Sequence, residues 1–437
     1  MKKRLLATIL TSVLVVGSLA GCGNSTKTET KESTKTDGKK TITVWAWDTN
    51  YNIPIIKEAG KRYTEKHPDV EIVVNEYTNE DVSKKLQTAF ASSTTKGLPD
   101  ITLMEDVKVQ KYLSTYTDQF VDLTSSLPFD KFADFKVKAV SYQDKKYGLP
   151  FDTGVAALFY RKDLLEKAGF TAKDLENITW DQYIEIGKKV KAATGVDWLV
   201  NDLYNGTTLE NIMIQSAGQW YYDDNGKINI KDNKALEESL TLIKKMNDEK
   251  IFLAANDWTE YVSAYSSGKA ATAIQGCWFL PTIKSDASAS GKWAVTSVPR
   301  LTKTPNAKNA SNQGGSSLYV LNSSENKDAS IDFLKEVFAG DADFYQKILK
   351  DQGALCAYLP AFEGSAFETK DEYFGGQQIF KNFAQYIKDV PQVTYDKNTA
   401  TAQNSVQAAI KDILDGNVEV SKVLGTIEEM TKNQTGE

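Results

Sequence analysis

The chain has 437 residues, of which 41% are hydrophobic, so it can bury a large core and is long enough for two or three domain-sized units. Acidic side chains outnumber basic ones by 58 to 52, which gives a formal net charge of -6 at pH 7. This balance argues against nucleic acid or an anionic lipid surface as the partner.

The first residues have the pattern of a secretory signal. Lys2, Lys3 and Arg4 precede an apolar run at residues 5–16, and small residues follow it. The run is too short for a membrane-spanning helix, which takes about 20 apolar residues. We therefore expect residues 1–21 to be a signal peptide.

The end of this signal, Leu19-Ala20-Gly21-Cys22, resembles a bacterial lipobox. The resemblance implies that Cys22 is lipidated and holds the mature protein at the extracellular face of the cytoplasmic membrane, in a Gram-positive type of cell envelope. Beyond Cys22 the chain has no apolar side chain up to residue 40, so residues 22–40 are predicted to be a lipidated cysteine and a flexible tether. Ordinary secretion, with Cys22 incidental, is the alternative.

From residue 41 onward, short apolar strands alternate with amphipathic helices. Strands are predicted at residues 42–44, 70–74 and 101–103, with helices at 54–67 and 82–90 between them. This order predicts a parallel sheet covered on both faces. Ligands of such sheets bind beyond the carboxyl ends of the strands.

A second unit of the same kind begins after residue 154. The apolar run at residues 155–160 suits a buried strand, and ITWDQYIEIGKKVKAATG, residues 178–195, predicts an amphipathic helix. The sequence between the two units offers no long linker, so we expect them to lie close together.

Several segments follow one another in an informative order: the lipobox and tether, ITVWAWD, LPDITLME, KKYGLPFDTGVAALFYRKDLLEKAGF, ITWDQYIEIGKKV, AYSSGKAATAIQGCWFL and NQGGSSLYVLNSSENKDASIDFLKEVF. Together they resemble extracellular solute-binding proteins of the maltodextrin-binding type, the sugar receptors of bacterial ABC importers. The resemblance covers essentially the whole mature chain. It implies a monomer that binds a carbohydrate, most simply a short oligosaccharide, without cofactor, metal or chemistry, and that passes it to ABC permease subunits.

The resemblance also implies the fold. We expect an α/β, two-lobed periplasmic-binding-protein fold (type II), in which each lobe is a mainly parallel sheet flanked by helices and hinge strands join the lobes. Crossings are predicted near residues 150–154, 297–311 and 353–360. The predicted lobes are residues 41–151 plus 305–355 at the N-terminal side and residues 152–304 plus 356–437 at the C-terminal side.

Sugar rings present apolar C–H faces and a rim of hydroxyls, so their sites need flat aromatic rings and planar acids or amides. Trp47 leaves the first strand at its carboxyl end, and its neighbour Asp48 is a hydroxyl acceptor; Trp45 on the same strand fits either the site or the core. The resemblance places a stacking Trp278 opposite Trp47. The remaining ligand-binding candidates are Glu105, Asp106, Asp152, Asn205, Asn211, Gly315 and Tyr395.

Two other functions fit parts of this pattern. Asp48, Asp106 and Asp152 beside aromatic rings also suit an extracellular glycoside hydrolase, which needs two carboxyl groups about 5 Å or 6.5 to 9.5 Å apart. Paired acids against aromatic rings also suit a receptor for polyamines or peptides.

Histidine and cysteine usage limits other chemistry. His67 is the only histidine and lies in a predicted turn, and Cys/His metal-ligand spacing is not evident, which argues against a Zn or Mn receptor. Cys277 and Cys356 are compatible with a disulfide, although two buried thiols are the favoured interpretation.

Overall fold

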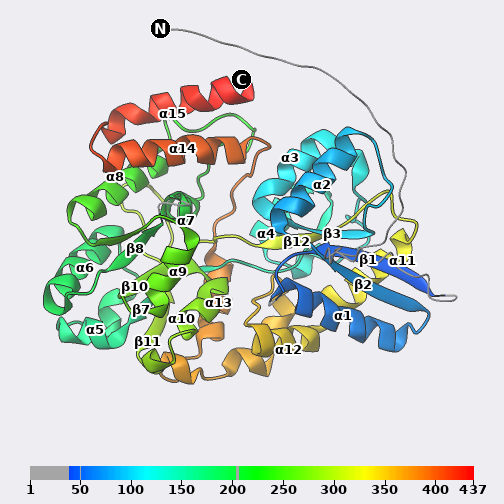
Figure 1. Cartoon of the computed structure of the whole chain (residues 1–437), viewed down its shortest axis with the longest axis horizontal. Helices are drawn as coiled ribbons and strands as arrows, with labels where there is room; N and C mark the ends of the chain where they lie inside the picture. The colour runs from blue at the N-terminus through cyan, green and yellow to red at the C-terminus, as the bar shows by residue number, and fades with distance from the viewer. Residues whose placement is uncertain (1–38, 50, 203–205) are drawn as a thin grey trace, which may run out of the picture. The chain divides into compact units, whose positions relative to one another are not determined.

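The computed structural model describes residues 39–49, 51–202 and 206–437. Lys40–Glu437 form one compact unit of sheets and helices (Figure 1). Among the described helices, none combines the length and the apolar composition that crossing a membrane requires. The predicted signal peptide and Cys22 lie outside the described residues.

The first sheet contains β1 (Lys40–Ala46), β2 (Val70–Glu76), β3 (Ile101–Glu105), β6 (Gly148–Pro150) and β12 (Ser316–Val320). Its strand order is β2-β1-β3-β12-β6. β1 pairs in parallel with both β2 and β3, which confirms the predicted strand, helix, strand order at the start of the fold. β12 lies antiparallel to its neighbours β3 and β6.

The second sheet is built around the buried strand β7 (Ala156–Arg161). β10 (Thr272–Gly276) and β11 (Trp293–Ser297) flank it, and both run antiparallel to it. β8 (Leu199–Asp202) and β9 (Phe252–Ala255) form a separate two-stranded sheet and are parallel to each other. The pairing around β7 therefore differs from the mainly parallel sheet that we predicted. β10 and β11 lie more than 100 residues after β7 in the chain, so no single strand, helix, strand crossover joins them to β7 and fixes a parallel direction.

Helices cover both sheets, and α14 and α15 pack against each other (Figure 1). The bounds of the helices and of one small hairpin are α1 (Asn52–Lys66), α2 (Asn79–Ala91), α3 (Asp106–Tyr116), α4 (Asp134–Ala139), β4 (Ser141–Tyr142), β5 (Lys145–Lys146), α5 (Lys162–Lys167), α6 (Trp180–Thr194), α7 (Thr208–Ser216), α8 (Lys234–Asp248), α9 (Trp258–Ser266), α10 (Leu280–Lys284), α11 (Lys327–Phe333), α12 (Ala342–Gln352), α13 (Ile379–Tyr386), α14 (Thr399–Leu414) and α15 (Val420–Thr435).

Helix α6 shows how closely local sequence sets these bounds. Thr179 and Gln182 form a reciprocal capping box at its start, and Gly195 ends it with a positive φ of 72°. The predicted apolar face is confirmed, since Trp180 and Ile184 are both buried.

Buried hydrophobic side chains form three clusters. The first packs α1 and α3 against the five-stranded sheet. The second joins α6, α7, α8, α14 and α15, and the third joins β7, β10, α9 and α13. The first sheet and the second sheet therefore have separate cores.

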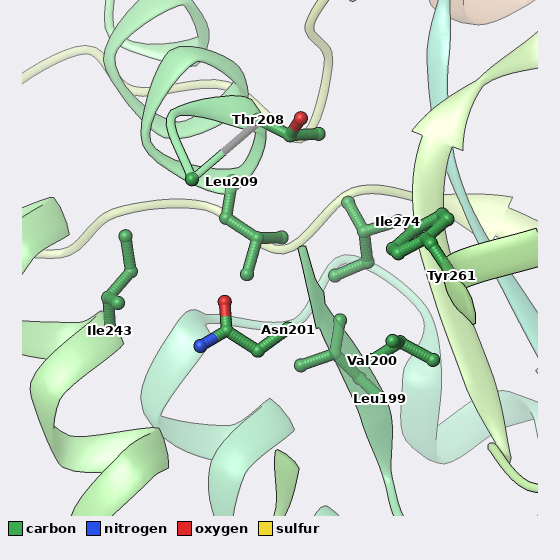
Figure 2. A pocket seen from close by; sticks show the side chains of 9 residues that line it. Leu199, Val200, Asn201, Thr208, Leu209, Ile243, Tyr261 and Ile274 are labelled. Carbon is green, nitrogen blue, oxygen red and sulfur yellow. The ribbon is translucent and has the colours of Figure 1, made fainter. Parts of the chain in front are cut away.

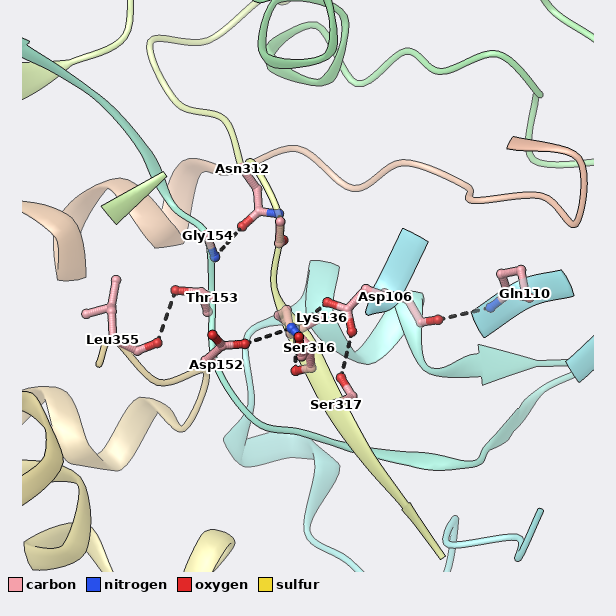
Figure 3. Close-up of polar contacts among 12 residues, drawn as sticks. Asp106, Gln110, Lys136, Asp152, Thr153, Gly154, Asn312, Ser316, Ser317 and Leu355 are labelled. Carbon is pink, nitrogen blue, oxygen red and sulfur yellow. Dashed lines mark hydrogen bonds and ion pairs between the residues drawn. The ribbon is translucent and has the colours of Figure 1, made fainter. Parts of the chain in front are cut away.

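Three chain segments run between these cores. Residues 151–155 join β6 to β7, residues 298–315 join β11 to β12, and residues 353–358 lead from α12 toward α13. We call them the first, second and third crossing segments. Figure 3 shows parts of all three, with polar contacts linking them.

The crossing segments contact one another through backbone and short side chains. In the first segment, Asp152 forms a β-bridge with Cys356 of the third. The Gly154 amide donates to Asn312 Oδ1 at 3.0 Å, and the Gln313 amide donates to the Gly154 carbonyl at 2.7 Å. The first segment is therefore held between the other two.

Gly154→Ala should destabilise the protein by about 2 to 3 kcal/mol. A Cβ at this position would lie 1.9 Å from the carbonyl oxygen of Gln313, so the two crossing segments would have to separate. Gly425→Ala in α15 is the matched control, because its Cβ would meet no atom within 4 Å, and we expect it to leave stability unchanged or slightly raised. Urea unfolding measures both. A Gly154→Ala variant as stable as the wild type would rule out this close approach.

Candidate functional site

A cavity of about 220 Å³ lies where the second crossing segment meets the end of β3 and helix α7. Ser316 of β12 pairs with Glu105 of β3, so the residues before Ser316 are brought to the carboxyl end of β3. The cavity is lined by Glu105, Val107, Asn211, Gln215, Trp220, Asn312, Gln313, Gly314, Gly315, Tyr395 and Gln403.

Amide side chains dominate this lining. Asn211 and Gln215 lie four residues apart on α7, which places them on one face of the helix, and both are buried. Gln403 contributes another amide from α14. Amides donate and accept at once, which suits hydroxyl groups that do the same. Glu105 is the one acid in the described lining, and Lys108 pairs with it at 2.6 Å.

Two aromatic side chains close the cavity on the α14 side. Trp220 and Tyr395 pack edge to face with ring centroids 5.2 Å apart. The buried indole Nε1 of Trp220 has no hydrogen-bond partner among the described residues. Burial, reinforced by the negative charge of Asp106, raises the pKa of Tyr395, so its hydroxyl stays protonated.

The structure brings four of the predicted residues, Glu105, Asn211, Gly315 and Tyr395, to this cavity. Sequence reasoning missed Gln215, Trp220 and Gln403. The spacing of Gln215 from Asn211 was a usable signal, because residues four apart share a helix face. Trp220 and Gln403 carried no such signal, since they reach the cavity only through tertiary packing.

Other hollows suit a ligand less well. Figure 2 shows a cavity of about 10 Å³ lined by side chains such as Leu199, Leu209 and Ile243, which has room for about one water molecule. A surface hollow of about 1060 Å³ runs past Lys66 and Asp343. Its described lining contains no aromatic side chain.

Trp278 lies next to the cavity wall, outside the residues that line the cavity itself. Its indole Nε1 donates to the carbonyl of Gln313 at 2.8 Å, and Gln313 lines the cavity. The Trp258 ring is 6.1 Å from that of Trp278 and stacks on Tyr261 at 5.3 Å. Trp258 is 41% exposed, the one large hydrophobic side chain so exposed in the part that the structure describes. Sequence reasoning did not single it out.

The residues at the end of β1 and just after it lie partly at the surface and partly in the core. Trp47 is half-buried and packs on the first cluster, and Asp48 is exposed with a positive φ of 69°. Asp48 Oδ1 accepts from the amide of Tyr51 at 3.1 Å, which anchors the turn before α1. Trp45 is only 6% exposed and packs edge-on against Tyr77, so the structure places it in the core, away from the cavity lining.

Asp106 belongs to a buried polar network beside the cavity (Figure 3). Its carboxylate forms an ion pair with the fully buried Lys136 and accepts from the Ser317 hydroxyl at 2.7 Å. Lys136 Nζ also donates to the Ser316 carbonyl at 3.0 Å. Both carboxylate oxygens of Asp106 thus have protein partners. Gly315 lies directly over this network, since a Cβ there would be 3.0 Å from Lys136 Nζ.

Asp152 extends the network into the first crossing segment. Its Oδ1 accepts from the Ser316 amide at 2.7 Å, and the residue is 9% exposed. Burial raises the pKa of Asp152 to about 6, although the charge of Lys136 opposes the shift. The structure therefore places Asp106 and Asp152 at the junction of the crossing segments, where they bond to protein groups.

A second buried polar group stands behind Asn211. The Tyr221 hydroxyl lies 2.6 Å from Asn211 Oδ1 and 2.7 Å from Glu210 Oε2. Glu210 is fully buried, and burial raises its pKa to about 8, against the opposing effect of the hydrogen bond from Tyr221. Asn211 Nδ2 reaches Thr207 Oγ1 at 3.3 Å.

The remaining predictions concern Asn205, the two cysteines and the histidine. Asn205 lies outside the described residues. Cys277 and Cys356 are free and buried. His67 contacts Glu336 at 2.8 Å, and the ligand atoms of His67, Asp332 and Glu336 lie within 4.8 Å of one another. Lys66 also pairs with Glu336, so this group is an ion-pair cluster on the first lobe.

Comparisons with known proteins identify the relatives of this chain. A family model described as a bacterial extracellular solute-binding protein matches residues 58–374. A protein named lactose-binding protein from Rhizobium radiobacter is 42% identical over 393 residues, which cover 90% of this chain and 92% of that protein.

Two solved structures resemble the whole described unit. An extracellular solute-binding protein of family 1 matches with a TM-score of 0.76 and 22% identity over 90% of this chain and 99% of that one. An ABC transporter associated binding protein from B. animalis subsp. lactis, in complex with β-1,6-galactobiose, matches with a TM-score of 0.71 and 25% identity over 91% of this chain and 98% of that one. The predicted two-lobed α/β fold is confirmed.

Proposed function

Because this chain belongs to the bacterial extracellular solute-binding protein family, we propose that it captures a short oligosaccharide in the cavity beside the crossing segments and delivers it to an ABC importer. The observation that carries the proposal is the lining of the cavity. Several amides, one acid and two aromatic rings meet there, which is the chemistry that a ring with apolar faces and a hydroxyl rim requires.

A disaccharide such as lactose is the first ligand to test. The lactose-binding protein that is 42% identical to this chain supports it, and so does the galactobiose complex of the structural relative.

We propose that Trp278 supplies one stacking face and that Trp47, with Asp48, supplies the opposing one. Trp278 is supported by its contact with Gln313 of the cavity wall. Trp258, next to Trp278 and partly exposed, extends the aromatic surface for a longer ligand.

Delivery requires that occupancy change the shape of the protein. We place the lobe boundaries at the three crossing segments, with residues 41–151 plus 305–355 as one lobe and 152–304 plus 356–437 as the other. A sugar that contacts Glu105 on one side and Asn211 on the other favours the form in which both are close. The permease would read that closed form.

Catalysis is the less favoured function. A glycoside hydrolase needs two carboxyl groups flanking the scissile bond, and the described lining holds only Glu105, paired with Lys108. Asp106 and Asp152 are bonded to Lys136 and Ser316. A polyamine receptor is also disfavoured, because a cation of several charges needs several acids, and the one acid of the described cavity lining, Glu105, already pairs with Lys108.

Attachment to the cell surface is part of the proposal. Cys22 follows a lipobox-like segment, and acyl chains add membrane affinity of about 0.8 kcal/mol for each buried CH₂. We propose a lipid anchor on Cys22, which mass spectrometry of the membrane-extracted protein would detect as an acylated N-terminal peptide.

Calorimetric titration tests the function directly. We expect lactose or a related galactoside to bind, and a ligand at 100 times its dissociation constant to stabilise the fold by about 2.7 kcal/mol. Spermidine is the control and should give no binding. Product analysis after long incubation should show intact sugar. Binding of spermidine alone, or cleavage of the sugar, would contradict the proposal.

A further inference from the structure

The buried groups behind Asn211 bear on how this residue meets a ligand. We propose that Glu210 is held as a neutral carboxylic acid and positions the Asn211 amide through the Tyr221 hydroxyl, so that Asn211 acts toward the ligand as a hydrogen-bond donor. Glu210 is thus a positioning residue. The inference rests on the proposed function, because it concerns the same cavity.

The Tyr221 hydroxyl has one hydrogen, yet it lies within 2.7 Å of two oxygens, Glu210 Oε2 and Asn211 Oδ1. Both contacts are hydrogen bonds only if one of those oxygens carries a hydrogen of its own. A carboxyl group can carry it and an amide oxygen cannot. Glu210 then donates to Tyr221, and Tyr221 donates to Asn211.

The surroundings of Glu210 favour the same state. Glu210 is 0% exposed, and its Oε1 has no hydrogen-bond partner among the described residues. An ionised carboxylate with one unbonded oxygen would be very costly there, whereas the carbonyl oxygen of an acid costs less. The described residues also include no ion-pair partner for Glu210 within 4.0 Å. Burial raises its pKa to about 8, in agreement with a neutral group at pH 7.

Neighbouring titratable groups leave this assignment in place. The pKa of Tyr221 is raised well above its usual value by burial and by Glu210, so its hydroxyl keeps its hydrogen. Helix α8 packs on α7, and its buried acid Glu238 accepts from the Thr302 and Lys303 amides and the Thr304 hydroxyl. Glu238 is therefore bonded to donors of its own, and Glu210 is the acid that faces Tyr221.

We call the hydrogen bonds that run from Glu210 through Tyr221 to Asn211 the relay. The relay determines which hydrogen-bonding groups Asn211 offers to a ligand. Its Oδ1 is engaged by Tyr221, and one Nδ2 hydrogen is directed at Thr207 Oγ1. The remaining hydrogen is available to the cavity that Asn211 lines. The matching ligand atom is an acceptor oxygen, such as a sugar hydroxyl or ring oxygen. An ionised Glu210 would instead accept the hydrogen bond of the Tyr221 hydroxyl. Asn211 Oδ1 would then lose its donor, and the amide could rotate.

Calorimetric titration with lactose from pH 7 to 9.5, above the pKa of about 6 of Asp152, tests the relay in the full chain. For the wild type we expect a loss of affinity of about tenfold between pH 7 and pH 9.5. Glu210→Gln keeps a neutral donor in place, so it should bind within about threefold of the wild type at pH 7 and lose the alkaline dependence. Tyr221→Phe should bind about tenfold more weakly at every pH.

Equal alkaline losses in the wild type and Glu210→Gln would overturn the inference, as would a wild-type affinity that is constant to pH 9.5. Infrared difference spectra between pH 7 and 9.5 provide a readout that needs no ligand and no variant. A protonated carboxyl band lost between these pH values supports the assignment, and its absence overturns it. A wild type with that band that binds no sugar would instead contradict the proposed function.

Discussion

Trp278→Ala should weaken sugar binding by about a hundredfold, which corresponds to about 3 kcal/mol. Two effects combine in this variant. The indole face that we propose for ring stacking is lost, and so is the hydrogen bond from Nε1 to the Gln313 carbonyl that supports the cavity wall. The side chain is only partly buried, so the fold should tolerate the change. Calorimetric titration with lactose measures the loss.

Two further variants separate the two effects. Trp278→Phe keeps an aromatic face and removes the Nε1 donor, so we expect a smaller loss of about tenfold. Trp258→Ala removes the neighbouring ring, which is 41% exposed, and should matter less for a disaccharide than for a longer sugar. A Trp278→Ala protein that folds and binds lactose as tightly as the wild type would show that this indole is structural only.

Lys136→Met should lower the free energy of unfolding by about 3 to 5 kcal/mol. Lys136 is fully buried, and its partner Asp106 has a side chain only 4% exposed. Removing the ammonium group leaves the Asp106 carboxylate buried without its counter-charge, although Ser317 still donates to it. The charge of Lys136 also opposes the raised pKa of Asp152, so that acid should become harder to ionise in the variant. Urea unfolding at pH 7 measures the change in stability.

The same helix provides the control. Lys138 on α4 pairs with Asp224 at 3.2 Å through side chains that are 39% and 79% exposed. Lys138→Met should therefore change stability by less than about 1 kcal/mol. Replacing both Lys136 and Asp106, by Met and Asn, should recover much of the loss because the Asp106 carboxylate is removed together with its counter-charge. A Lys136→Met variant as stable as Lys138→Met would contradict a buried ion pair.

Local patterns predicted the first sheet well and the second sheet less well. The strands that became β1, β2 and β3 alternate with amphipathic helices, and a crossover of that kind produces parallel neighbours. The pairing around β7 depends on segments such as β11, more than 130 residues further along the chain, and strand direction at that distance leaves no mark in local periodicity.

The candidate site shows the same division. Glu105 was predicted from its position just after a strand and Asn211 as an amide from the second lobe, and both line the cavity. Asp106 follows Glu105 directly, yet it points into a buried network, because one residue at a strand end changes which side of the chain a carboxylate faces. Trp45 has the strand parity of Trp47 but is covered by Tyr77, a neighbour that only the folded chain brings to it.

A crystal structure of the protein with lactose would show whether a sugar occupies the cavity at the second crossing segment. We predict electron density for the sugar in that cavity, with Asn211 donating to a sugar oxygen and the Trp278 ring against a sugar face. Density for lactose elsewhere on the protein, with Asn211 and Trp278 untouched, would contradict the account.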